Sequence, residues 1–163
     1  MNIALTIDGL LRNPETDGVI PLGNALYQAL ATQHTVYLLS DDLDLPRTHN
    51  WLRVNGLHRH TRVIQPRRPS DWRTDVQLRL DAVGYITGTG TKVDLVLDPD
   101  PAITAELLAL GYPVATLTLP HFAKPQWRPD YTQEPRPWDA LVDEVETQAQ
   151  AYATDPRRNA EPL

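Results

Sequence analysis

The chain has 163 residues, of which 41% are hydrophobic, and a net charge of −6. These values are typical of one globular domain, large enough to bury roughly 70% of the surface that its unfolded chain would expose. The absence of cysteine excludes disulfides, thiolate metal sites and cysteine nucleophiles. The negative charge disfavours a general nucleic-acid binder, which carries a basic surplus.

The predicted elements alternate between short apolar runs, typical of buried strands, and segments with apolar residues at helical spacing. Gly, Pro and Asn residues mark most of the boundaries between them. In chain order they are strand 3–7, helix 22–31, strand 35–39, helix 47–55, strand 61–64, helix 70–84, strand 92–98, helix 102–110, strand 112–119 and helix 138–152.

This alternation predicts crossover units and a mainly parallel sheet. We therefore expect one α/β domain over residues 1–153, a Rossmann-like three-layer sandwich with helices on both faces of the central sheet. Residues 154–163 are polar without periodicity, which predicts a flexible C-terminal tail.

Polar residues lie at the ends of four predicted strands, of which the last, 112–119, carries Thr118 and His121. Thr6 and Asp8 end the first strand, Ser40 follows the second, and Asp98 and Asp100 follow the fourth. In an open parallel sheet, ligands bind outside the carboxyl ends of the strands, where the connection order reverses. The sequence therefore predicts a polar site at that edge of the sheet.

The opening Thr6-Ile7-Asp8-Gly9 resembles the first motif of the haloacid dehalogenase (HAD) superfamily, an apolar strand that ends in Asp-x-Asp-Gly. In that family the first Asp attacks phosphorus and the second acts as general acid/base. Asp8 and Gly9 match the second Asp and the Gly, whereas Thr6 stands at the nucleophile position. The resemblance covers residues 1–119 and implies an uncapped HAD-like phosphatase fold.

The same resemblance implies a role for each polar residue. Ser40 would hydrogen-bond the phosphoryl group, Arg79 or Lys92 would supply the third-motif cation, and Asp8 with Asp98 and Asp100 would hold Mg²⁺. Because Thr6 removes one carboxylate from the magnesium shell, we expect weak binding of Mg²⁺.

The segment from Leu119 to Trp138 resembles HAD-like proteins encoded by actinobacterial phages. An uncapped member of the family implies a macromolecular substrate or an accessory chain that closes the site. We therefore expect a phosphate-bearing small molecule or a phage protein as partner. The chain has no signal-peptide pattern and no apolar run near the ~18 residues of a membrane span. We expect the protein in the cytoplasm. If it is encoded by a phage, we expect it in the host cytoplasm or in the virion.

Three functions stay open at this point. The first is a catalytically impaired protein, a pseudoenzyme, that binds phosphate and magnesium or serves in assembly. The second is an active Mg²⁺-dependent phosphatase on nucleotides or nucleic-acid ends, with Asp8 as general base. The third is a structural virion or interaction module. Whether the chain is an enzyme depends on whether phosphoester hydrolysis is possible with Thr6 at the nucleophile position.

Two other patterns carry weaker hypotheses. His58 and His60 are two residues apart, which permits a metal site on a strand but is more often a loop or an exposed edge. The glycine-rich segment 84–90 lacks the following Lys-Ser/Thr of a phosphate loop, and we interpret it as a flexible connection.

Overall fold

The computed structural model describes residues 1–65, 74–119, 124 and 127. The chain divides into two compact units, Met1–Pro129 and Asp130–Leu163, and all described residues lie in the first. The predicted helix 138–152, the tail 154–163 and the domain boundary at 153 lie outside the described residues. In the described part, no helix has the length and apolar character needed to cross a membrane.

The described residues form one α/β domain around a five-stranded, all-parallel sheet with the strand order β3-β2-β1-β4-β5. The strands are β1 (Asn2–Thr6), β2 (Thr35–Leu39), β3 (Arg62–Ile64), β4 (Leu95–Asp98) and β5 (Val114–Thr116). The helices between them are α1 (Pro21–Gln33), α2 (Leu45–Val54), α3 (Asp75–Gly88) and α4 (Pro101–Ala109).

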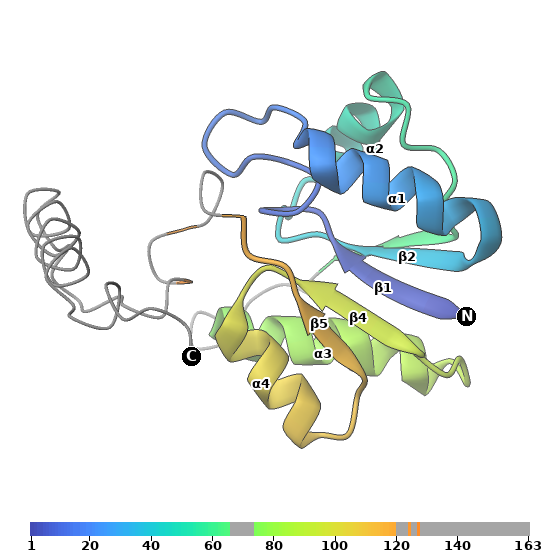
Figure 1. The fold of residues 1–163 in the computed structure, drawn as a ribbon, viewed down its shortest axis with the longest axis vertical. Helices are drawn as coiled ribbons and strands as arrows, with labels where there is room; N and C mark the ends of the chain where they lie inside the picture. Colours follow the sequence, from blue (N-terminus) through green and yellow to red (C-terminus); the bar gives the residue numbers. More distant parts are fainter. Residues whose placement is uncertain (66–73, 120–123, 125–126, 128–163) are drawn as a thin grey trace, which may run out of the picture. The chain divides into compact units, whose positions relative to one another are not determined.

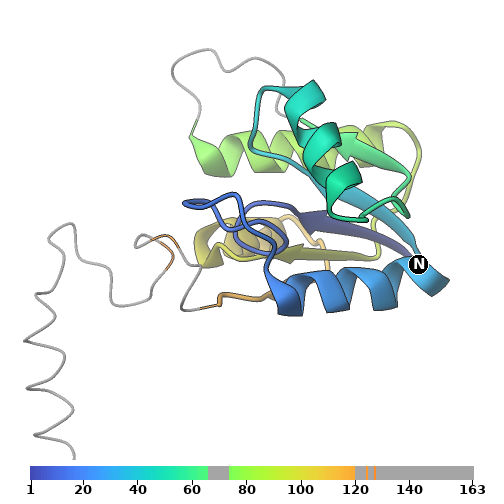
Figure 2. The same ribbon diagram turned by 90° about the horizontal axis from the view of Figure 1, so that it is seen from above.

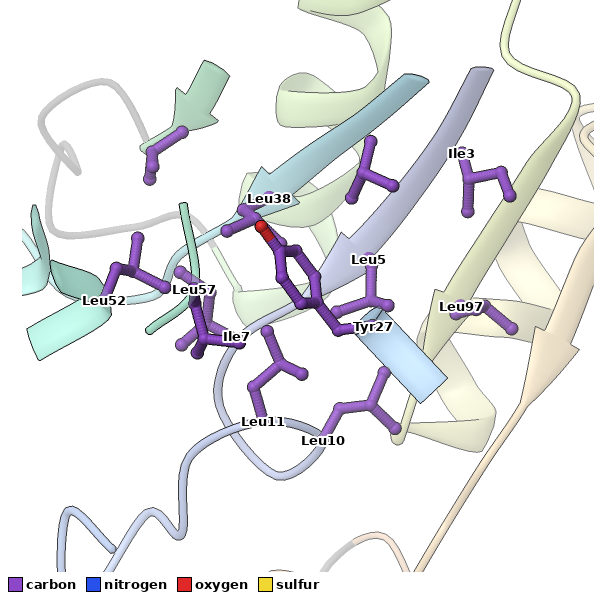
Figure 3. Packing of buried hydrophobic residues seen from close by; sticks show 12 residues of the cluster. Ile3, Leu5, Ile7, Leu10, Leu11, Tyr27, Leu38, Leu52, Leu57 and Leu97 are labelled. Carbon is purple, nitrogen blue, oxygen red and sulfur yellow. The ribbon is translucent and has the colours of Figure 1, made fainter. Parts of the chain in front are cut away.

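The helices cover both faces of the sheet, with α1 and α2 on one side and α3 and α4 on the other (Figures 1 and 2). Successive side chains of a strand point to opposite faces, so β1 places Ile3 and Leu5 in one core and Ala4 in the other. Figure 3 shows the first core, where the Tyr27 ring of α1 packs among leucine and isoleucine side chains. The three-layer, Rossmann-like architecture predicted from the sequence is thus confirmed.

A tight turn follows β1 and fixes the chain near its carboxyl end. The carbonyl of Ile7 accepts hydrogen bonds from the amides of Leu10, Leu11 and Arg12, at 3.3, 2.8 and 2.9 Å. Gly9 takes a φ of +82°, and a Cβ there would lie 2.3 Å from the Trp127 ring, so only glycine fits. Arg12 then pairs with Val19 in an antiparallel bridge.

The third helix differs from its prediction at both ends. Its N-cap is Thr74, which forms a capping box with Gln77, whereas the predicted start at Ser70 lies outside the described residues. The helix also continues to Gly88, so the interpretation of segment 84–90 as a flexible connection is wrong for most of its length. Val83 and Ile86 are buried against the sheet, and this packing holds the glycine-containing turn in the helix.

Candidate functional site

The candidate site lies where the strand order reverses, between β1 and β4. These two central strands pair in parallel with Leu5 opposite Leu97, so their carboxyl ends lie side by side. The crossovers that leave β1 and β4 run in opposite directions along the sheet, which makes this edge the expected ligand position of a doubly wound fold. The geometry brings Thr6 and Asp98 into direct contact.

The centre of the site is a buried group of three polar side chains, one hydrogen bond and one ion pair. The Thr6 hydroxyl donates to Asp98 Oδ2 at 2.6 Å, and both residues have an exposed fraction of 0%. Arg79, which α3 brings to the same carboxylate, places its Nε 3.2 Å from Asp98 Oδ2. Burial opposes the charged form of Arg79, but the nearby Asp41, Asp98 and Asp8 carboxylates outweigh it and raise the pKa of Arg79.

A second ion pair lies at the rim of the site. Arg12 Nε donates to Asp8 Oδ1 at 2.7 Å, and the second oxygen of Asp8 accepts from the amide of Asp41 at 3.3 Å. Arg12 is 4% exposed. Burial opposes its charged form, yet the hydrogen bond and the charge of Asp8 leave the pKa of Arg12 above its ordinary value. The Asp8 carboxylate is therefore held by a buried cation.

Ser40 and Asp41 form the side of the site that β2 contributes. The Ser40 hydroxyl accepts from the amide of Asp42 at 3.1 Å and lies 3.4 Å from the hydroxyl of Thr48. Asp41 pairs with Arg79 Nη2. Burial raises the pKa of Asp41; the Arg79 guanidinium opposes this shift, and Asp8 adds to it. The cavity between Ser40, Asp41 and Arg79 holds about 10 Å³, which is room for one water molecule and too little for a phosphate group.

A larger pocket of about 260 Å³ opens on the Arg12 side of the rim. It is lined by acidic and basic side chains, and its four carboxylates pair with arginine. Asp8 pairs with Arg12, Asp17 with Arg47, Asp42 with both Arg12 and Arg47, and Asp41 with Arg79. The lining residues are Asp8, Arg12, Pro14, Asp17, Asp41, Asp42, Arg47 and Lys124.

The structure thus separates the residues predicted for the site. Thr6, Asp8, Ser40, Arg79 and Asp98 gather at the carboxyl ends of the strands. Asp100 lies at the same edge, because its amide donates to Asp98 Oδ1 at 2.9 Å, whereas Lys92 does not.

Lys92 lies near the opposite edge, since its carbonyl accepts from the side chain of Asn2 at the start of β1 and its ammonium group pairs with Asp94. Asp100 is the N-cap of α4, and its carboxylate accepts from the amide of Ala102 at 2.8 Å.

The residues present do not fit a magnesium ion at Asp8, Asp98 and Asp100. Magnesium requires oxygen ligands that face a common, hydrated centre. Here both carboxylate oxygens of Asp8 and of Asp98 already accept hydrogen bonds, and each carboxylate contacts a guanidinium. Within residues 1–65, 74–119, 124 and 127, no group of three or more Asp, Glu or His side chains has the geometry to hold a metal.

Sequence reasoning missed Arg12, Asp42 and Arg47, which line the pocket. The one signal for Arg12 was a basic residue four positions after Asp8, a spacing that has meaning in helices. Here the spacing works because the turn after Ile7 folds the chain back, which the sequence alone did not indicate.

The comparisons with known proteins show a shared fold. No family model matches the chain, and no curated protein matches it. A chain of a structure named "Structure of Pnkp1/Rnl/Hen1 complex" superposes with a TM-score of 0.59 at 17% identity, covering 71% of this chain and 45% of that chain. A chain of the "Structure of the Pnkp1/Rnl/Hen1 RNA repair complex" gives a TM-score of 0.60 at 17% identity, with 71% and 42% covered.

This chain thus spans less than half the length of these two neighbours. Their likeness is one of α/β fold.

Proposed function

We propose that this domain is a HAD-like protein that binds a phosphate group in the pocket at the carboxyl ends of β1 and β2 and has lost phosphatase turnover. The observation that carries the proposal is the state of Thr6, whose hydroxyl is buried and donates a hydrogen bond to Asp98. The order of the polar groups along the chain, from Thr6 and Asp8 through Ser40 to Asp98, supports the HAD assignment together with the strand order.

Attack on phosphorus needs a nucleophile in line with the phosphoryl group and a base that accepts its proton. Thr6 does not line the pocket, so phosphorus cannot approach its oxygen. Among the described residues, Asp98 is the one hydrogen-bond partner of the hydroxyl, and its carboxylate is paired with Arg79. These contacts favour a structural role for Thr6.

A second candidate function is an active Mg²⁺-dependent phosphatase on nucleotides or nucleic-acid ends. Two observations favour it: Asp8 lines the pocket, where it can act as base for a water molecule, and the neighbours are named as an RNA repair complex. The neighbours' name also supports a protein partner for this chain. The phage origin and the assembly role stay predictions from the sequence resemblance alone.

A phosphoester panel with Mg²⁺ tests the proposal, using p-nitrophenyl phosphate, nucleotides and end-phosphorylated oligonucleotides with wild type, Thr6→Asp and Asp8→Asn. We expect no hydrolysis above the buffer rate by wild type, and stabilisation of the wild type by inorganic phosphate in a melting scan. Wild-type turnover that Asp8→Asn abolishes would contradict the proposal and favour the second candidate. Absence of both turnover and phosphate stabilisation would favour the structural module. Turnover gained only by Thr6→Asp would support a degenerate enzyme.

A further inference from the structure

We infer that the guanidinium groups of Arg12 and Arg79 neutralise this site in place of a divalent cation, and that Arg12 presents a free N–H to a phosphate group without metal. The inference rests on the proposed phosphate site and specifies how that site holds its ligand. Four features of the described residues carry it.

The first feature is the pairing of the two buried carboxylates. Asp8 has Arg12 Nε at 2.7 Å, and Asp98 has Arg79 Nε at 3.2 Å. A metal in such a site would offset the repulsion between clustered carboxylates. Here each carboxylate has its own arginine counter-ion, and each arginine side chain is only 5% exposed. These ion pairs reduce the repulsion that would recruit Mg²⁺.

The second feature is an unused hydrogen-bond donor on Arg12, a residue that lines the pocket. Among the described residues, Arg12 Nη1 has no hydrogen-bond partner although it is buried. The nearest carboxylate oxygen, Asp42 Oδ2, lies 3.6 Å away, which is an ion-pair distance and too long for a hydrogen bond. A buried donor without a partner costs about 1–3 kcal/mol. A phosphate oxygen in the pocket would satisfy it, and guanidinium groups match phosphate geometry well.

The third feature is the fixed position of the Arg12 side chain. Its backbone forms bridges with Asp8 and Val19, and its guanidinium lies 5.6 Å from the centre of the Trp51 ring. The indole of Trp51 is itself held, since its N–H donates to the carbonyl of Asp17 at 2.7 Å. Little side-chain entropy remains to be lost when an anion binds, and this preorganisation favours affinity.

The fourth feature is the placement of the open space. The cavity beside Ser40 and Arg79 holds about 10 Å³, whereas the pocket beside Arg12 holds about 260 Å³ and includes Arg47 and Lys124. Lys124 pairs with no carboxylate in the described part of the chain, and its ammonium lies 5.2 Å from the Trp127 ring. Pockets for whole drug-sized ligands measure about 300–1,000 Å³, so we expect this one to take a phosphate group whose remaining atoms extend outside.

The test is a melting scan of wild type, Arg12→Gln and Arg47→Gln with inorganic phosphate, once in EDTA and once in Mg²⁺, beside Mg²⁺ alone. Arg47 is the matched control, because it lines the same pocket but is 57% exposed and does not contact Asp8. We expect phosphate to stabilise wild type equally in both buffers and Mg²⁺ alone to have no effect. Arg12→Gln should weaken phosphate binding at least about tenfold, the weight of one charged hydrogen bond, and should gain stabilisation by Mg²⁺ because Asp8 loses its counter-ion.

Each other result has a separate meaning. Phosphate binding that requires Mg²⁺, or stabilisation of wild type by Mg²⁺ alone, would overturn the inference and leave the proposed phosphate site standing. Equal losses in Arg12→Gln and Arg47→Gln would also overturn it, since the buried donor would then have no special role. Absence of phosphate binding in every buffer would refute the proposed site itself. If Arg12→Gln does not fold, Arg12→Lys replaces it, since it keeps the charge and loses the forked donor.

Discussion

Thr6→Asp restores the residue that the HAD resemblance implies, and we expect it to destabilise the domain. The hydroxyl of Thr6 lies 2.6 Å from Asp98 Oδ2, and both residues are fully buried. The substitution replaces a hydrogen-bond donor with a second carboxylate. In the described part of the chain, the one guanidinium that pairs with Asp98 is that of Arg79, and it also pairs with Asp41. An uncompensated buried charge costs about 3–5 kcal/mol, which corresponds to a fall in Tm of roughly 10–25 °C for a domain of this size.

The loss should depend on pH and on magnesium. Two close carboxylates share a proton, so one folded-state pKa of the variant rises above its unfolded value. The folded variant then binds more protons than the unfolded chain, and its stability falls as pH rises. We therefore expect a larger loss at pH 8 than at pH 5, and partial recovery with Mg²⁺ at pH 8, measured by urea unfolding.

Thr6→Val is the control for the Thr6→Asp experiment. It removes the donor without adding charge and should cost about 1–3 kcal/mol, because Asp98 then lacks one hydrogen bond. A Thr6→Asp variant as stable as wild type at pH 8 without Mg²⁺ would refute the reasoning, since the two side chains would then not share one buried space.

Three further predictions concern the scaffold of the site. Gly23→Ala should destabilise the domain by about 3 kcal/mol or more, because its Cβ would lie 1.7 Å from the Leu10 carbonyl oxygen; Gly84→Ala, with no atom within 4 Å, should be neutral or stabilising in the same unfolding assay. Arg79→Met should cost about 3–5 kcal/mol by leaving Asp98 unpaired, and a loss below 1 kcal/mol would contradict the buried pair. Burial lowers the pKa of His60, so the folded domain resists protonation and should lose stability as pH falls below about 6.5; His60→Gln should remove that dependence, and an unchanged pH profile would contradict it.

Much of the fold was predictable because the strands are continuous apolar runs with turn residues at their ends. Such runs bury both faces of a parallel sheet, and the run from Thr35 to Leu39 matches β2 residue for residue. Helix ends were less predictable. Both Ser70 and Thr74 are good caps, and the choice depends on Gln77 completing the capping box.

The site was predictable to the extent that it depends on strand direction. Residues that follow β1, β2 and β4 meet at one edge, as expected for parallel strands. The same rule would have separated Lys92, which precedes β4, from Arg79. The contacts of Arg12 were not predictable, because they depend on how the turn after Ile7 folds and on where the ring of Trp51 lies.

A crystal structure of the wild-type chain with both Mg²⁺ and inorganic phosphate would test the account most directly. The account predicts phosphate density against Arg12 Nη1 in the pocket beside Asp42, with Asp8 and Asp98 still paired with their arginines. A magnesium ion that bridges Asp8 and Asp98, with Arg12 displaced, would contradict it.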